Sequence, residues 1–235
     1  MNAAAALNAI EPAPAMVRRL VLKDWYFQRY TILAYLLAGA LALGLLALPS
    51  EPAFYAGSIL LLTVVIALGF HLVMATVVGE RIEQTLPFVM TLPVAPMQYT
   101  TAKIVANLLI FLVPWTTLTV GAVIVVLSRE AIPDGLLPYT LLLMVQLLQG
   151  YIFVLSTAII SESQGWTIGV MVSCNLLLQA FMYSVSRLPG IAGTLKGPTV
   201  SWSPTASLVL GVLLALSACA LALTFWAQGR KRHYL

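Results

Sequence analysis

Few side chains in this sequence could do chemistry, and the richest group of them lies in one polar interruption between two apolar stretches. The interruption spans residues 79–103 and reads GERIEQTLPFVMTLPVAPMQYTTAK. Its first charged side chains are Glu80, Arg81 and Glu83. Pro93 and Pro96 should end any helix before the next apolar stretch begins. We expect a short helix along a membrane surface, with charges that have no role in lipid or core and so dock a partner.

The remaining polar residues offer no catalytic pairing. A hydrolase needs a nucleophile with a nearby base, or a metal motif such as H-E-x-x-H, and His71 and His233 assemble neither. Cys174 and Cys219 have neither zinc-site spacing nor the pattern of a disulfide framework. The phosphate-binding pattern G-x-x-x-x-G-K-[ST] does not occur. We therefore expect no enzymatic activity and no cofactor or metal bound by the chain itself.

Five polar side chains interrupt the apolar stretches and could line a pathway. Gln146 and Gln149 are three residues apart, and Asn175 and Gln179 are four apart, so each pair shares one helix face. These amides either bond neighbouring helices or line a path for an amphipathic substrate. His71 is ionisable and also lies within an apolar stretch. It has either a structural hydrogen bond or a role in proton or ligand transfer.

The elements that position these residues are long apolar helices. Hydrophobic residues make up 61% of the 235-residue chain, charged residues 9%, and the mean hydropathy is +0.98, values typical of an integral membrane protein. Runs of about 20 apolar residues can cross a bilayer as helices. They are too continuous for the strands of a barrel. The sequence predicts an all-α membrane protein with six spans at about 30–48, 54–78, 102–127, 137–160, 166–185 and 206–227.

The chain should form a single membrane domain over residues 16–235, after a flexible N-terminus of residues 1–15. Residues 16–29 alternate apolar and basic side chains at helical spacing. They predict an interfacial helix on the inner leaflet with Trp25 and Tyr26 at headgroup depth, or else an extension of the first span. Residues 186–204 predict an outer loop that either dips into the outer leaflet or stays at the surface.

Basic residues predict the orientation. With both termini cytoplasmic, nine basic residues lie inside: Arg18, Arg19, Lys23, Arg29, Arg81, Lys103, Arg230, Lys231 and Arg232. Three lie outside: Arg129, Arg187 and Lys196. This is the positive-inside asymmetry of a multi-pass protein of a bacterial-type cytoplasmic membrane. Anionic lipid headgroups account for the net charge of +4, so we expect lipid partners and no nucleic acid.

The interruption and its flanks resemble the ABC-2 type permeases, the membrane subunits of ATP-driven ABC exporters. In that family a stretch resembling E-x-x-x-G-T-L joins the second and third spans, followed by T-L-P-V-[ST] and a Lys that opens the next helix. The matching residues are Glu80, Thr85, Leu86, Thr91, Leu92, Pro93, Val94 and Lys103. Gln84 replaces the usual Gly, and Ala95-Pro96 replaces Ser-Arg. The resemblance extends to the KDWYFQR segment, the six spans, the outer loop before the last span and the basic tail.

The resemblance implies a permease that pairs with a second copy or a related permease above two ATPase subunits. The ATP and Mg would be held by those ATPase subunits. Glu80, Arg81 and Glu83 would contact the ATPase, and Thr85 and Leu86 would position the coupling helix. An amphipathic or lipid-like substrate would move outwards along the subunit interface; the residues do not choose among lipid, polyketide, peptide and drug.

Two other function classes stay open. One is an ion-coupled secondary transporter, which the absence of Asp, Glu, Lys and Arg from the middle of every predicted span disfavours. The other is a membrane scaffold that transports nothing.

Overall fold

The computed structural model describes residues 13–82, 96–130 and 132–230. The described chain is helical and contains no strand. Its elements are α2 (Ala13–Leu46), α3 (Glu51–Val73), the π-helix η1 (Met74–Val78), α4 (Gly79–Ile82), α6 (Pro96–Ser128), the 3-10 turn η2 (Asp134–Leu136), α7 (Leu137–Ser161), α8 (Gln164–Val185) and α9 (Pro204–Arg230). Six helices are long and apolar enough to span a membrane, which confirms the predicted class and number of spans.

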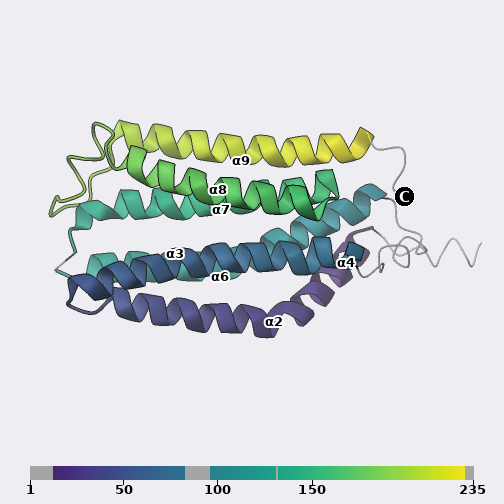
Figure 1. Cartoon of the computed structure of the whole chain (residues 1–235), viewed down its shortest axis with the longest axis horizontal. Helices are drawn as coiled ribbons and strands as arrows, with labels where there is room; N and C mark the ends of the chain where they lie inside the picture. Colours follow the sequence, from purple (N-terminus) through teal and green to yellow (C-terminus); the bar gives the residue numbers. More distant parts are fainter. Residues whose placement is uncertain (1–12, 83–95, 131, 231–235) are drawn as a thin grey trace, which may run out of the picture.

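The helices pack as two groups that share α7 as a link. Helices α2, α3 and α6 contact one another, α8 and α9 both pack on α7, and α7 in turn contacts α3 and α6. Both described ends, Ala13 and Arg230, lie at the same end of the bundle as α4 and the start of α6 (Figure 1). This end is called the terminal end below, and the other is called the loop end.

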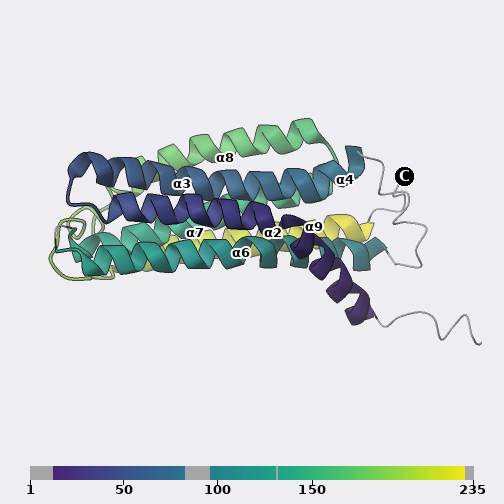
Figure 2. The same ribbon diagram turned by 90° about the horizontal axis from the view of Figure 1, so that it is seen from below.

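The N-terminal basic segment takes the second of its two expected forms, an extension of the first span. Residues 16–29 are not a separate element, because α2 runs without a break from Ala13 to Leu46. Figure 2 shows the first part of α2 bending away from the bundle. Residues 13–15 belong to this helix, so that part of the expected flexible N-terminus is wrong, and residues 1–12 lie outside the described residues.

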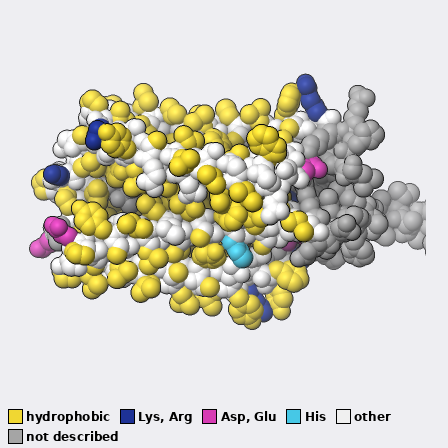
Figure 3. Space-filling model, viewed as in Figure 1, with side chains coloured by type: hydrophobic (Ala, Val, Ile, Leu, Met, Phe, Trp, Pro, Cys, Tyr) yellow, Lys and Arg dark blue, Asp and Glu magenta, His cyan; other side chains and the backbone are white. Residues whose placement is uncertain are grey.

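The core lies where α2, α3, α6 and α7 meet. Its fully buried side chains include Leu68, Leu72, Phe111 and Leu155. The rings of Phe111 and Tyr151 stack with centroids 3.9 Å apart, which joins α6 to α7. Figure 3 shows, on the face in view, hydrophobic side chains along the length of the bundle and charged side chains mostly towards its two ends, the distribution that a membrane protein requires.

At the loop end the connections pack on each other. The Gly135 N–H donates to Gly197 O at 3.0 Å, and a Cβ on Gly135 would lie 1.9 Å from Thr194 O. Only glycine allows this approach. Ile191, a residue of the 186–203 segment, is buried in a second hydrophobic cluster with residues of α7, α8 and α9. The segment is therefore packed as part of the fold. Pro114 lies inside α6, which continues on both sides of it.

Candidate functional site

Four charged side chains at the terminal end form a cluster that joins three segments. Lys103 Nζ on α6 lies 3.0 Å from Asp24 Oδ2 on α2 and 2.7 Å from Glu80 Oε1 on α4. Lys23 Nζ lies 3.2 Å from the same Glu80 oxygen. Lys103 and Asp24 are each only 5% exposed. We call Lys23, Asp24, Glu80 and Lys103 the ion cluster.

The ion cluster is electrically balanced, with two cations and two carboxylates. Moving one charge out of water costs several kcal/mol, which a well-placed opposite charge offsets. Lys103 is held by two carboxylates from elements far apart in sequence, so neither can move without leaving a buried charge behind. The cluster therefore ties α2 and α4 to the beginning of α6. Of these, α4 and α6 flank residues 83–95.

The predicted coupling residues meet this cluster at one point. The sequence predicted no core role for Glu80, and that is wrong, because the Glu80 side chain is only 16% exposed and pairs with Lys103. The reason is that α4 turns this carboxylate towards α6. The Arg81 side chain, Glu83, Thr85 and Leu86 lie outside the described residues.

A π-helix precedes α4 and brings a hydroxyl into the core. Met74–Val78 forms the π turn, a feature that recurs at functional sites. Thr76 Oγ1 lies 2.7 Å from Leu72 O and 2.7 Å from Asn107 Oδ1, and its single proton serves one of them at a time. This contact joins the turn before α4 to α6.

Asn107 extends the polar contacts from the ion cluster into the bundle. Its Nδ2 donates to Lys103 O at 3.0 Å, and its own carbonyl accepts from the Tyr151 hydroxyl at 2.9 Å. Asn107, Thr76 and Tyr151 are all buried. We call Lys103, Asn107, Thr76 and Tyr151 the polar chain. It runs from the ion cluster to α7 and has its side-chain amide satisfied on both sides.

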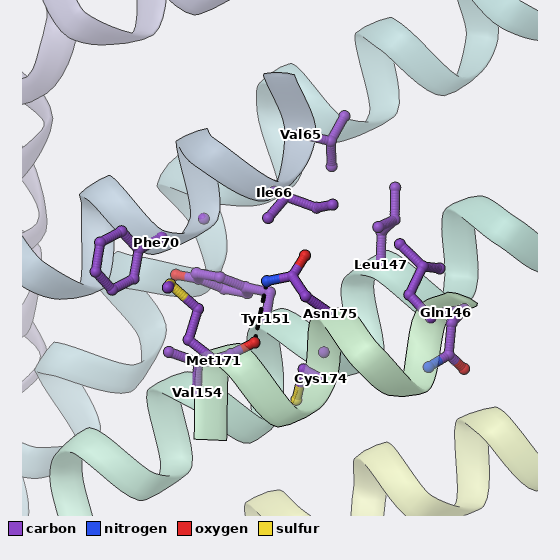
Figure 4. A pocket seen from close by; sticks show the side chains of 13 residues that line it. Val65, Ile66, Phe70, Gln146, Leu147, Tyr151, Val154, Met171, Cys174 and Asn175 are labelled. Carbon is purple, nitrogen blue, oxygen red and sulfur yellow. Dashed lines mark hydrogen bonds between the residues drawn. The ribbon is translucent and has the colours of Figure 1, made fainter. Parts of the chain in front are cut away.

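The polar chain ends at a small pocket between α3, α7 and α8, shown in Figure 4. Tyr151, Gln146 and Asn175 are among its lining residues. Asn175 Nδ2 donates to Met171 O at 3.0 Å. The volume is about 50 Å³. Ligand pockets are typically about 300–1,000 Å³, so this pocket in its described form holds no substrate-sized molecule.

The five predicted pathway residues do not form one lining. Gln146 and Asn175 line the small pocket together. Gln146 and Gln149 line a groove between α7, α8 and α9, where Gln146 Oε1 is buried with no hydrogen-bond partner among the described residues. Gln179 and His71 are exposed on the surface of the single chain. His71 has the Tyr35 ring beside it, with centroids 6.0 Å apart.

Sequence reasoning missed Asp24, Thr76, Asn107 and Tyr151. Asp24 is the one acidic residue of KDWYFQR, and an acidic residue directly before an apolar span was a usable signal. Asn107 is an amide within an apolar run, as Gln146 is. Thr76 and Tyr151 carried no such signal, because hydroxyl residues are common in spans and usually bond the preceding turn.

No group of three His, Cys, Asp or Glu side chains that could hold a metal ion occurs in residues 13–82, 96–130 and 132–230. Cys174 is half-buried, Cys219 is exposed, and both are free thiols. Neither family models, nor curated proteins, nor solved structures gave a match to the chain.

Proposed function

We propose that the chain is the membrane-spanning permease subunit of an ATP-driven ABC exporter of the ABC-2 type, with no enzymatic activity of its own. The supporting observation is the ion cluster, which ties together the segments on both sides of residues 83–95. The sequence predicts the coupling helix in that segment. An ATPase that pulls on it would act directly on α4 and α6.

A coupling segment transmits force only if its attachments are stiff. Lys103 lies two helical turns after the start of α6 at Pro96, and its ammonium is buried between Asp24 and Glu80. Separating these groups would leave unpaired buried charges, which is costly. Motion of the coupling segment would therefore move α2, α4 and α6 together. The polar chain carries the same attachment to α7 through Tyr151.

The substrate path would lie between two permease copies. The pocket of about 50 Å³ that Gln146 and Asn175 line together is too small for an amphipathic substrate. Gln179 and His71 are exposed on apolar helices, and polar side chains within a membrane usually avoid lipid. A second copy, or a related permease, would cover them. The substrate would be an amphipathic or lipid-like molecule moved outwards.

The protein would lie in a bacterial-type cytoplasmic membrane with both termini inside. The bent first part of α2 would then rest on the inner leaflet, because Trp25 and Tyr26 are exposed there, and aromatic rings favour the headgroup region. ATP and Mg would be bound by the partner ATPase. Anionic lipids would be the other partners, and nucleic acid would not be one.

The test replaces one coupling charge. The chain is purified with an ATPase encoded beside it in the same genome, and complex formation and ATP hydrolysis are measured for Glu83→Lys. If Glu83 meets basic or donor groups of the ATPase, reversal brings repulsion into the interface. We expect normal expression, because an added inner Lys obeys the positive-inside rule. Association or stimulated hydrolysis should fall about tenfold, equivalent to about 1.4 kcal/mol.

Glu130→Lys is the matched control, because Glu130 is an exposed acidic residue at the loop end. It should leave ATPase association unchanged. Equal effects of the two reversals would reject the coupling role of residues 83–95. Substrate movement driven by an ion gradient without ATP would identify a secondary transporter instead, and failure to stimulate any ATPase would favour a scaffold.

A further inference from the structure

The loop end contains an apolar cavity that the proposed function does not use. Its volume is about 280 Å³, and α2, α3, α6 and α7 supply most of its wall. Leu46, Leu62, Val125 and Leu143 are representative of the lining. A cavity of this size lies at the lower end of the range of ligand sites, which is about 300–1,000 Å³. It is far larger than the packing gaps of a protein interior.

Three of the four hydroxyl groups that line this cavity donate to backbone carbonyls, and the fourth is that of Tyr55. Ser58 Oγ donates to Phe54 O, Thr140 Oγ1 donates to Leu136 O, and the Tyr139 hydroxyl donates to Met182 O. The rest of the wall is made almost entirely of apolar side chains. The cavity is therefore suited to a hydrocarbon chain.

The cavity leads to a second hollow of about 540 Å³ whose rim carries cations. The two share Leu46, Phe54, Tyr55, Ile132 and Leu136. Arg129, Lys196 and Glu51 supply the charged groups of the second hollow. Within the described part of the chain, the side chains of Arg129 and Lys196 make no ion pair or hydrogen bond. The rim thus holds two unpaired cations against one carboxylate.

We propose that this end binds an anionic lipid-like amphiphile, with its hydrocarbon chain in the 280 Å³ cavity and its acidic head between Arg129 and Lys196. Hydrophobic burial holds the chain, and charge-assisted hydrogen bonds hold the head. Lys196 is brought to the rim because its loop docks on Gly135. The site does not rest on the exporter proposal, since it consists only of groups within one chain.

The experiment uses the full chain in detergent micelles and a photoactivatable fatty acid with its reactive group near the end of the hydrocarbon chain. After irradiation, the labelled peptides are identified by mass spectrometry. We expect labelling of the cavity-lining segments of α6 and α7. Oleate should compete at least about tenfold better than oleyl alcohol, which has the same chain and a neutral head.

Three variants separate head from chain. Arg129→Gln combined with Lys196→Gln should weaken competition by oleate about tenfold and leave oleyl alcohol unchanged. Arg187→Gln is the matched control, because Arg187 is an exposed cation at the same end that stacks on Tyr183 and does not line the hollow. Ser58→Leu narrows the cavity and should reduce labelling by the photoactivatable fatty acid and weaken competition by both oleate and oleyl alcohol.

Three results would overturn the proposal. One is labelling spread over the exposed faces of α8 and α9, which would indicate ordinary surface lipid. Another is equal competition by oleate and oleyl alcohol. The third is an unchanged oleate affinity in the double Arg129, Lys196 variant when its thermal unfolding matches that of the parent chain.

Discussion

The two ends of the bundle treat charge in opposite ways. At the terminal end, Lys103 is buried and held at 3.0 Å and 2.7 Å by two carboxylates. At the loop end, Arg129 and Lys196 stand unpaired, among the described residues, above an apolar cavity of about 280 Å³. Both ends have basic residues near the limits of the apolar spans. At the terminal end these residues are packed among carboxylates, whereas at the loop end they lie beside a cavity.

The difference indicates which end holds the helices together and which end could bind a ligand. Charges that are buried and paired within the chain have no capacity left for a ligand, and they resist separation. At the loop end, the exposed Lys196 and the half-buried Arg129 beside an apolar cavity can supply both electrostatic and hydrophobic free energy to a bound molecule. We therefore infer that the terminal end positions the helices and that the loop end binds an anionic amphiphile.

The largest expected effect concerns the side of the membrane on which each end lies. In a background without Cys174 and Cys219, single cysteines at Ser128 and Thr199 should react with an impermeant thiol reagent added outside intact cells. Cysteines at Gln98 and Ser163 should not react, because the distribution of basic residues predicts that the terminal end lies inside. Labelling of a cysteine at Gln98 from outside would show that the terminal end lies on the outer side of the membrane.

The next effect tests the terminal end. Lys103→Met should lower the free energy of unfolding by about 3 kcal/mol, because it leaves the buried Asp24 carboxylate with only the exposed Lys23 ammonium, which lies 4.0 Å away. Thermal unfolding of the purified protein in detergent measures the change.

Lys196→Met is the control for this effect at the loop end, where the side chain is exposed, and it should change stability by less than about 0.5 kcal/mol. Similar losses in the two variants would show that the ion cluster contributes nothing beyond an ordinary surface charge.

A smaller effect is expected along the polar chain. Asn107→Leu removes the amide that meets Thr76 Oγ1 and Lys103 O, at a cost of about 1 kcal/mol for the lost side-chain hydrogen bonds. Hydrogen exchange of the residues around the π turn should rise more than that of α8. Uniform exchange across the bundle would contradict a local role.

The apolar spans could be predicted from sequence because length and hydropathy are local properties of the chain. The ion cluster could not. Lys103 and Glu80 are 23 residues apart, and Lys103 and Asp24 are 79 apart, so their pairing depends on how α2 and α6 pack. A charge at the edge of a span appears solvated in the sequence until a second helix covers it.

Only part of the candidate site could be predicted, because the contacts between its helices depend on tertiary packing. The amides of Gln146 and Asn175 were identified one helix at a time, and packing of α7 on α8 brought them to one pocket. Gln179 shares a helix with Asn175, but no neighbouring helix of the same chain covers it. Helical spacing predicts which residues share a face, whereas tertiary packing decides what that face meets.

The π turn at Met74–Val78 has a geometric consequence for the ion cluster. A π turn contains one residue more than an α turn at the same place. If the segment relaxed to regular α-helix, every residue after it would rotate by roughly 100° about the helix axis. Glu80 would then lie out of reach of Lys103, and the helix register before residues 83–95 would shift by one residue. The extra residue of the π turn thus sets the rotation of α4 that the Glu80–Lys103 ion pair requires.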